Sequence, residues 1–316
     1  MEYRFRLLNV FAESQFGGNP LCVFEDARGL SDVQMQTLAA QFNLSETVFV
    51  FPSSSDEAQA ALRIFTTMNE LPFAGHPSLG AAAVVSELQG GRRNLKLECR
   101  AGVIEMFGAS PINQAFKVAP RASNWTLKAP LSTTEYQRDC FRAPEVEARI
   151  LAEMLGLNEE ALMAPPVWVN TGNEHLLIPL KSADDLVRAR INPTRLYEWP
   201  VSRLGRQNAF VFAMQTKDAD NGLADQKQVI EVQARYWFAK QGAVAEDPAT
   251  GSAAANWAAW CLLQGEGKAV RAIISQGHAM LRPSKLMVSA EIDTNQVPRI
   301  LVGGDVIEIG SGVLHL

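Results

Sequence analysis

Two short segments of the sequence combine an ionisable residue with a proline and a run of small residues. His76 precedes Pro77, and Asp247 precedes Pro248. Asp is a strong N-cap and Pro suits the first turn of a helix, so we expect both ionisable residues at the start of a helix. The unpaired N–H groups and the positive dipole end at such a start favour a bound anion such as a carboxylate. Either motif alone is typical of a well-capped buried helix, whereas the two together indicate acid–base or anion-binding chemistry.

The two segments also align with each other as an internal repeat. The alignment needs no gap when His76 stands opposite Asp247, an offset of 171 residues. A looser echo pairs residues 18–21 (GNPL) with residues 172–175 (GNEH). Such a repeat predicts two like domains related by a pseudo-twofold axis. If that axis brings the two helix starts together, they form a cleft between the domains.

Small residues near these helix starts have two interpretations. Gly80 and Gly251 weaken a helix by about 1 kcal/mol each relative to Ala, which indicates close packing or the close approach of a ligand. Ser252 could donate a hydrogen bond to an anion, or it could be a small residue packed within the helix.

Glu46 is the candidate for proton transfer, since it lies at the entry to the apolar strand predicted at 47–51. A strand would present its carboxylate rigidly, and apolar neighbours would raise its pKa. The alternative is an ordinary solvated loop residue. Glu70 could play the same part, but we expect it to position the loop before His76. Glu246 adjoins Asp247, and because sequence neighbours point apart the two need not form a catalytic pair.

Several other functions are disfavoured by composition and motifs. The four histidines have no metal-ligand spacing, and no phosphate-binding loop or Gly-x-Ser-x-Gly nucleophile motif is present. The net charge of −5 disfavours nucleic acid and anionic membranes as partners. The uncharged stretch 248–265 is too polar to span a bilayer, and the N-terminus lacks the apolar region of a signal peptide. Four scattered cysteines indicate reduced thiols in a cytoplasmic protein.

The elements that position these residues read mostly as short strands, with few helices. Because strands do not alternate with amphipathic helices, we expect an α+β fold with antiparallel-rich sheets curled around two buried helices rather than a doubly wound parallel sheet. We place the domains at residues 1–132 and 133–308. Helices are predicted at 32–42, capped by Ser31, and at 145–157. The predicted strands are 3–11, 21–24, 47–51, 60–66, 95–99, 103–107, 176–180, 209–214, 229–237, 269–275, 285–291 and 299–309.

Six segments together resemble the PhzF-like family of phenazine-biosynthesis isomerases, and they cover nearly the whole chain. The resemblance implies the fold of diaminopimelate epimerase, with two similar domains and a C-terminal strand, here about 309–316, that crosses back to the first domain. It further implies a homodimer that needs no metal or organic cofactor. The segments are FAESQFGGNPLCVF (11–24), NLSETVFV (43–50), ELPFAGHPSLG (70–80), VNTGNEHLLIPL (169–180), EDPATGSAA (246–254) and RPSKLMV (282–288).

The resemblance also implies roles for individual residues. Glu46 matches the family's proton-shuttling glutamate, and His76 and Asp247 match the residues at the two helix starts. Ser252, with the backbone N–H groups of Gly75 and Gly251, matches the groups that hold the substrate. The epimerase carries cysteines at its helix starts. This chain carries His76 and Asp247 there instead, so a cysteine-based racemase is disfavoured.

The sequence thus predicts a cofactor-independent isomerase in which Glu46 moves a proton on a small carboxylate-bearing metabolite. Two alternatives stay open. One is a binding or interaction protein that keeps the fold without turnover, and the other is a racemase or epimerase that uses Glu46 with His76 or Asp247. Leu281 stands where the family commonly has Gly, and residues 115–140 match no family segment.

Overall fold

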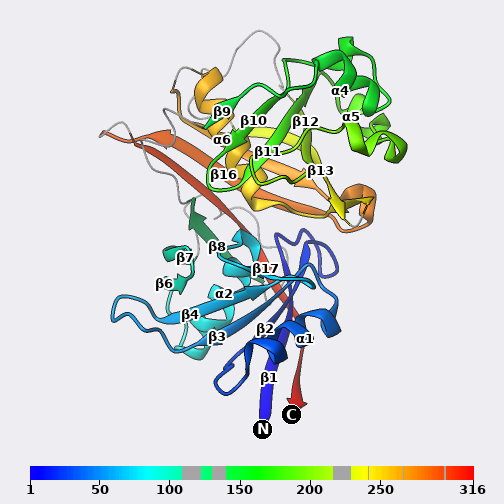
Figure 1. Cartoon of the computed structure of the whole chain (residues 1–316). Helices are drawn as coiled ribbons and strands as arrows, with labels where there is room; N and C mark the ends of the chain where they lie inside the picture. The colour runs from blue at the N-terminus through cyan, green and yellow to red at the C-terminus, as the bar shows by residue number, and fades with distance from the viewer. Residues whose placement is uncertain (109–121, 130–139, 216–228, 241, 266, 295–296) are drawn as a thin grey trace. The chain divides into compact units, whose positions relative to one another are not determined.

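The computed structural model describes residues 1–108, 122–129, 140–215, 229–240, 242–265, 267–294 and 297–316 (Figure 1). The chain forms two compact units. Unit 1 comprises Met1–Lys128, Arg282–Lys285 and Gly303–Leu316, and unit 2 comprises Ala129–Leu281 and Leu286–Val302. The predicted boundary between residues 132 and 133 lies outside the described residues, as does most of the segment 115–140.

Eight strands of unit 1 pair in a closed ring around one helix. Along the ring, β17–β1, β1–β2, β3–β4, β6–β7 and β7–β8 are antiparallel, β2–β3 and β4–β6 are parallel, and β8 pairs with β17. The helix α2 (Gly75–Leu88) contacts seven of these strands. The ring strands are β1 (Glu2–Val10), β2 (Asn19–Phe24), β3 (Glu46–Phe51), β4 (Ala60–Phe65), β6 (Asn94–Cys99), β7 (Gly102–Gly108), β8 (Ala122–Lys128) and β17 (Pro298–His315).

The sequence of α2 explains its central position. Its residues are almost all apolar or small, and ten of the fourteen are buried, so the helix has no polar face that is exposed to solvent. Gly80 lets the helix approach the sheet closely, because a Cβ at this position would lie 2.3 Å from Cδ2 of Leu21. The prediction of a helix buried on nearly all sides is confirmed.

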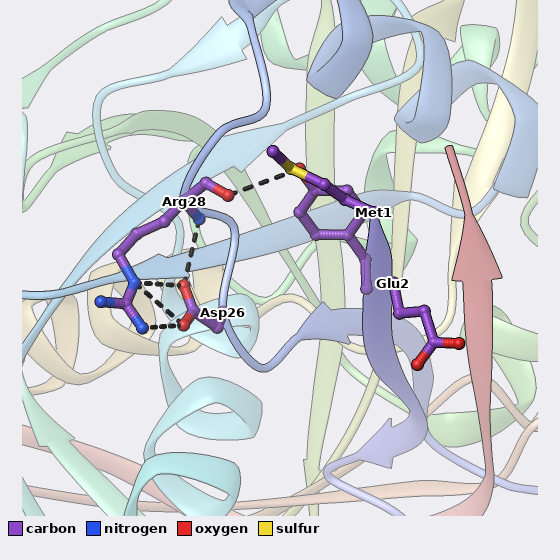
Figure 2. Close-up of a pocket in the computed structure, with 5 residues that line it drawn as sticks. Met1, Glu2, Asp26 and Arg28 are labelled. Carbon is purple, nitrogen blue, oxygen red and sulfur yellow. Dashed lines mark hydrogen bonds and ion pairs between the residues drawn. The ribbon is translucent and has the colours of Figure 1, made fainter.

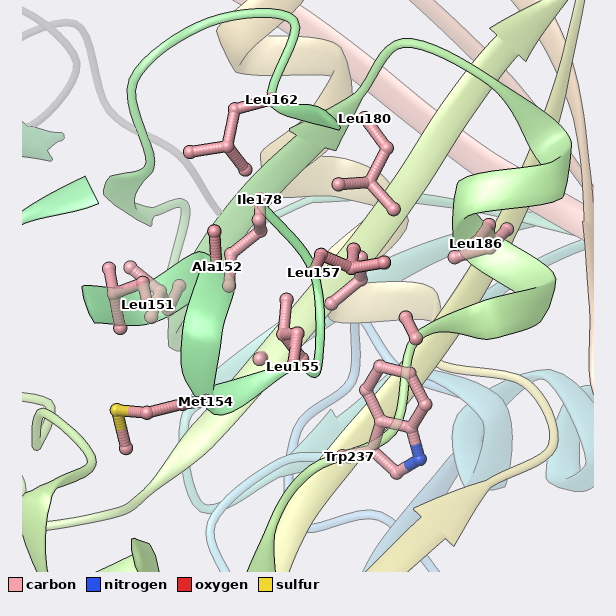
Figure 3. Close-up of a cluster of buried hydrophobic side chains, with 14 of the residues drawn as sticks. Leu151, Ala152, Met154, Leu155, Leu157, Leu162, Ile178, Leu180, Leu186 and Trp237 are labelled. Carbon is pink, nitrogen blue, oxygen red and sulfur yellow. The ribbon is translucent and has the colours of Figure 1, made fainter. Parts of the chain in front are cut away.

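Unit 2 is built on the second buried helix, α6 (Gly251–Gln264), which contacts β10, β11 and β15. Its packed core joins α4 (Ala148–Met154) and α5 (Ala183–Arg188) to the strands, and Figure 3 shows Leu151, Ile178, Leu186 and Trp237 within that cluster. The strands are β9 (Phe141–Arg142), β10 (Val167–Asn170), β11 (Glu174–Leu180), β12 (Asn208–Gln215), β13 (Ile230–Lys240), β14 (Ala243–Asp247), β15 (Val270–Gln276) and β16 (Ser284–Ile292).

The two units share one order of strand pairing. In unit 1, β1–β2 is antiparallel, β2–β3 parallel, β3–β4 antiparallel, β4–β5 (Glu70–Leu71) antiparallel and β4–β6 parallel. In unit 2, the pairs β10–β11, β11–β12, β12–β13, β13–β14 and β13–β15 run in the same directions. A short helix follows the second strand in both, namely α1 (Asp32–Phe42) and α5. The fold is therefore a sheet-rich α+β fold built from a duplicated unit.

The structure corrects the register of the internal repeat. The two central helices begin at Gly75 and Gly251, which are 176 residues apart, and not at the predicted offset of 171. At the new offset both segments read Glu-x-Pro-x-x-Gly, beginning at Glu70 and at Glu246. His76 is therefore equivalent to Ser252. Asp247 has Leu71 as its equivalent, because each lies at the end of the strand before its helix.

Among the remaining elements, most predicted strands are found within one or two residues. Helix α1 is capped by Ser31 and Gln34 in a capping box, as predicted. The helix predicted at 145–157 is shorter, because Gly156 adopts a left-handed conformation with φ of 70° soon after its last turn. Among its described residues, unit 2 also has 3-10 helices at Glu159–Ala161, Pro193–Glu198 and His278–Met280. Within the described ranges, no helix is both long and apolar enough to cross a membrane.

Candidate active site

Unit 1 brings Glu46 and His76 together. Glu46 is the first residue of β3, and His76 is the second residue of α2. The distance between Glu46 Oε2 and His76 Nε2 is 3.4 Å, and the side chains are 18% and 9% exposed. Burial lowers the pKa of His76 to about 3, so the imidazole is neutral near pH 7. The pair is thus a carboxyl group beside an uncharged ring.

The elements around this pair hold it rigidly. Strand β3 is one of the ring strands, and its first residue, Glu46, pairs in parallel register with Leu21 of β2. Helix α2 has Ala74 as its N-cap residue, which makes no side-chain cap hydrogen bond. The first N–H groups of a helix have no partner within the helix, so those of Gly75 and His76 can serve a ligand. A Cβ at Gly75 would meet only Leu127, at 3.6 Å, so Gly75 leaves open space at the helix start.

In unit 2 the structure corrects the predicted position of Asp247. It is the last residue of β14, and the N-cap residue of α6 is Thr250. Asp247 is therefore no N-cap, and Pro248 is not the first helical residue. Instead the Thr250 hydroxyl donates to the Asp247 carboxylate at 2.5 Å, and Gln276 Nε2 donates to the Asp247 carbonyl at 2.8 Å. These bonds hold the carboxylate close to the start of α6 from the loop side.

Ser252, the second residue of α6, contacts His175, which in turn contacts Tyr236, and neither of these two was predicted from the sequence as a site residue. Ser252 Oγ lies 2.8 Å from Nε2 of His175, and Nδ1 of His175 lies 3.0 Å from the Tyr236 hydroxyl. His175 comes from β11 and Tyr236 from β13. The weaker sequence repeat did point to His175, because aligning residues 18–21 with residues 172–175 places this polar residue opposite the apolar Leu21.

Glu70 and Glu246 occupy equivalent positions and hold equivalent ion pairs. Glu70 binds Arg63 through both oxygens, at 2.8 and 2.7 Å, and Glu246 binds Arg235 in the same way, at 3.0 and 2.7 Å. Each arginine also stacks on an aromatic ring two residues further along its strand. Both glutamates therefore form ion pairs beside the strand before a central helix, and both carboxylate oxygens of Glu246 are engaged by Arg235.

A surface pocket in unit 1 contains none of these residues. It is lined by Met1, Glu2, Tyr3, Asp26 and Arg28 (Figure 2). Arg28 is already engaged by Asp26, at 2.5 Å. In the part of the chain that the structure describes, no three His, Cys, Asp or Glu side chains are grouped as metal ligands would be.

Comparison with known proteins places these residues in a family. The sequence model of the phenazine biosynthesis-like family, PhzC-PhzF, matches residues 8–312. An uncharacterized isomerase of Pasteurella multocida is 36% identical over 99% of this chain and 94% of its own length. The trans-2,3-dihydro-3-hydroxyanthranilate isomerase of Pseudomonas chlororaphis is 31% identical over 99% and 100%. The crystal structure of a Bacillus anthracis PhzF-family protein superposes with a TM-score of 0.81 over the full length of both chains, at 20% identity.

The chain therefore belongs to the phenazine biosynthesis-like family and has the fold of its structurally known members. Its enzyme class is that of an isomerase, which is the class named for these relatives.

Proposed function

We propose that this protein is a cofactor-independent isomerase that moves a proton between two carbon atoms of a small carboxylate-bearing metabolite. The observation that carries the proposal is the contact between Glu46 and the buried neutral His76. It supplies one group that can take up and release a proton, beside one group that stays uncharged.

In the proposed reaction Glu46 acts first as base and then as acid. Its carboxylate removes a proton from carbon, and the electron pair of the broken C–H bond moves into the unsaturated system of the substrate. The carboxyl group then returns the proton to another carbon on the same face, where a new C–H bond forms. Glu46 ends as a carboxylate, so protons and electrons balance without a further reactant. Such acid–base catalysis contributes about a hundredfold to ten-thousandfold in rate.

The neutral state of His76 suits this cycle. A fixed cation beside Glu46 would lower the pKa of the carboxyl group and make it a weaker base. A neutral imidazole stabilises the ionised form of Glu46 less than a cation would. The carboxyl group can therefore gain and lose its proton during each turnover. With its pKa lowered to about 3, His76 is also a poor second base, which argues against a two-base racemase that uses Glu46 and His76.

We assign substrate binding to Ser252 and to the first N–H groups of the central helices, including those of Gly75 and Gly251, and keep Asp247 with Glu46 and His76 as a candidate catalytic residue. Hydroxyl and backbone donors at a helix start suit a carboxylate. The curated relatives named trans-2,3-dihydro-3-hydroxyanthranilate isomerase act on such a compound, an unsaturated ring with a carboxylate. We therefore infer a substrate of this class, and that compound is the first to be tested.

The test is Glu46→Gln, assayed in D₂O with trans-2,3-dihydro-3-hydroxyanthranilate and a panel of unsaturated carboxylic acids. Gln keeps the shape of Glu but cannot carry the proton, so we expect turnover to fall about a hundredfold or more while substrate affinity stays within a few fold. Proton NMR follows the position of the double bond and the sites of deuterium uptake. The matched control is Glu57→Gln, whose side chain is 74% exposed in the same unit.

Three results would overturn the proposal. Full activity of Glu46→Gln would remove Glu46 from the chemistry. Deuterium uptake at a stereocentre without migration of the double bond would identify an epimerase. Binding of a carboxylic acid with no exchange in the wild-type protein would indicate a binding protein.

A further inference from the structure

A buried chain of three side chains ends at the start of α6, in unit 2. Tyr236 and His175 are 8% and 2% exposed, and their rings meet edge to face. The chain runs from the Tyr236 hydroxyl through both ring nitrogens of His175 to Ser252 Oγ, over distances of 3.0 and 2.8 Å. Ser252 itself is only partly buried, so this end can meet a ligand.

The protonation states of the two buried rings are fixed by their surroundings. Burial lowers the pKa of His175 to about 4, against the opposing effect of the neighbouring Asn208 side chain, so its ring is neutral near pH 7 and has one donor nitrogen and one acceptor nitrogen. Burial, together with the negative charge of Asp247, raises the pKa of Tyr236 well above its usual range. Tyr236 therefore keeps its proton and must donate it.

Hydrogen-bond accounting then sets the direction of the chain. Within the described part of the protein, the Tyr236 hydroxyl has His175 Nδ1 as its one hydrogen-bond partner. If Nδ1 carried the ring proton, the buried phenolic proton would have no acceptor, which is costly. Tyr236 must therefore donate to Nδ1, and the ring proton lies on Nε2. His175 then donates to Ser252 Oγ, and the Ser252 proton is left to point towards a ligand.

The duplicated fold supports a special role for this histidine. In unit 1, Leu21 of β2 pairs with Glu46 of β3. In unit 2, the register of β11 and β12 places His175 beside Asn208. His175 is therefore equivalent to Leu21, and Asn208 is equivalent to Glu46. Unit 2 thus has no carboxyl group at the position of Glu46. It has instead an imidazole on the neighbouring strand, bonded to the start of the helix. The same scaffold carries a proton-transfer pair in one unit and a fixed donor chain in the other.

We propose that His175 is a positioning residue, which Tyr236 holds in its Nε2–H form so that the Ser252 hydroxyl can donate only to an acceptor on the substrate, such as a carboxylate oxygen. The proposal deepens the proposed function, on which its substrate class rests. It assigns to Tyr236 and His175 a part in carboxylate recognition, without contact of either residue with the substrate.

The first experiment reads the tautomer directly and needs no turnover. Long-range ¹H–¹⁵N correlation spectra of the ¹⁵N-labelled protein report which nitrogen of each of the four histidines carries the proton. The His175 signals are assigned by their loss in His175→Gln. We expect Nε2–H for His175 in the wild type and a mixture of tautomers in Tyr236→Phe, which removes the donor to Nδ1. A wild-type ring protonated at Nδ1 would overturn the proposal.

The second experiment measures the consequence for binding, with trans-2,3-dihydro-3-hydroxyanthranilate as substrate. Loss of a hydrogen bond to a charged group is expected to raise KM about tenfold in Tyr236→Phe while kcat stays within about twofold. The rise should be absent when Ser252 is already Ala, because Tyr236 acts through that hydroxyl. Tyr197→Phe is the control, since Tyr197 is 82% exposed.

The outcomes separate the two proposals. Additive effects of Tyr236→Phe and Ser252→Ala, or an unchanged KM in Tyr236→Phe, would overturn the positioning role even if Glu46 proves catalytic. If the wild type does not turn over the substrate, the proposed substrate fails, and the tautomer measurement still decides the role of His175.

Discussion

At the scale of single residues, the protein maintains two histidines in their neutral form by burial. The pKa values of His76 and His175 are lowered to about 3 and about 4, with desolvation as the main cause in both. Neither ring can carry the charge that an exposed histidine gains in weak acid. Both are thereby available as neutral hydrogen-bonding groups over the whole neutral range.

This burial predicts a pH dependence of stability. In the unfolded chain a histidine binds its proton near pH 6.5, whereas the folded protein resists protonation until about pH 4 or below. Between these values the unfolded state binds more protons, so the free energy of unfolding falls as the pH falls. Each histidine contributes at most about 1.4 kcal/mol per pH unit. Urea unfolding at about pH 7, 6 and 5 measures the decrease.

Two ion-paired carboxylates, Glu70 and Glu174, do not obscure this window, whereas burial raises the pKa of Asp305 and works against the trend, so the titration is measured in an Asp305→Asn background. The pKa values of Glu70 and Glu174 are held below their usual range, by hydrogen bonds from Arg63 and Arg142 respectively, so both stay ionised above about pH 5. The exposed His315 offers a control, because His315→Gln should leave the slope unchanged. A stability that does not change between pH 7 and pH 5 would contradict the neutral state of the buried histidines.

At the scale of elements, each central helix packs against its surroundings through the residue at the same position along the helix. In α2 this residue is Gly80, which lets the helix approach Leu21, Val10 and Leu8. In α6 it is Asn256, whose amide donates to the carbonyls of Val169 and Asn173. One helix is held by apolar contact and the other by polar bonds to neighbouring backbone.

Replacement of Gly80 tests the tight contact. In Gly80→Ala the new Cβ would stand 2.3 Å from Cδ2 of the buried Leu21, so packing must shift. We expect a loss of about 1–3 kcal/mol in unfolding free energy, which outweighs the better helix propensity of Ala. Gly310→Ala is the control, because a Cβ there meets nothing within 4 Å. A Gly80→Ala protein as stable as the wild type would show that the helix can move away without cost.

Much of the element pattern could be predicted, because apolar runs and turn residues mark strands directly. The start of α6 could not. Asp247-Pro248 satisfies the rules for an N-cap and first helical residue, yet the Asp247–Thr250 hydrogen bond forms a loop, and the helix begins at Gly251. His175 was missed for a different reason. Its partners Tyr236 and Ser252 are 61 and 77 residues away, so only the folded sheet brings them together.

At the scale of the whole molecule, β17 closes the ring of unit 1 by pairing with β1 over the span from Val306 to His315. Removal of residues 306–316 would leave β1 without this partner and open the ring. We expect the amides of β1 and β2 to lose protection in hydrogen exchange, because a broken ring exposes the buried helix α2. Removal of Leu316 alone is the control. Unchanged protection after the longer deletion would show that the ring is stable without its last strand.

The position of β17 in the chain also governs how the protein is made. During translation β1 is synthesised first and β17 after the other described strands. The ring of unit 1, although its synthesis begins first, can therefore close only at the end. While the rest of the chain is translated, β1 exposes an unpaired edge of the kind that joins strands of other molecules. During synthesis the nascent chain therefore depends on protection of that edge, and slow translation of the second half prolongs the risk of aggregation for the first.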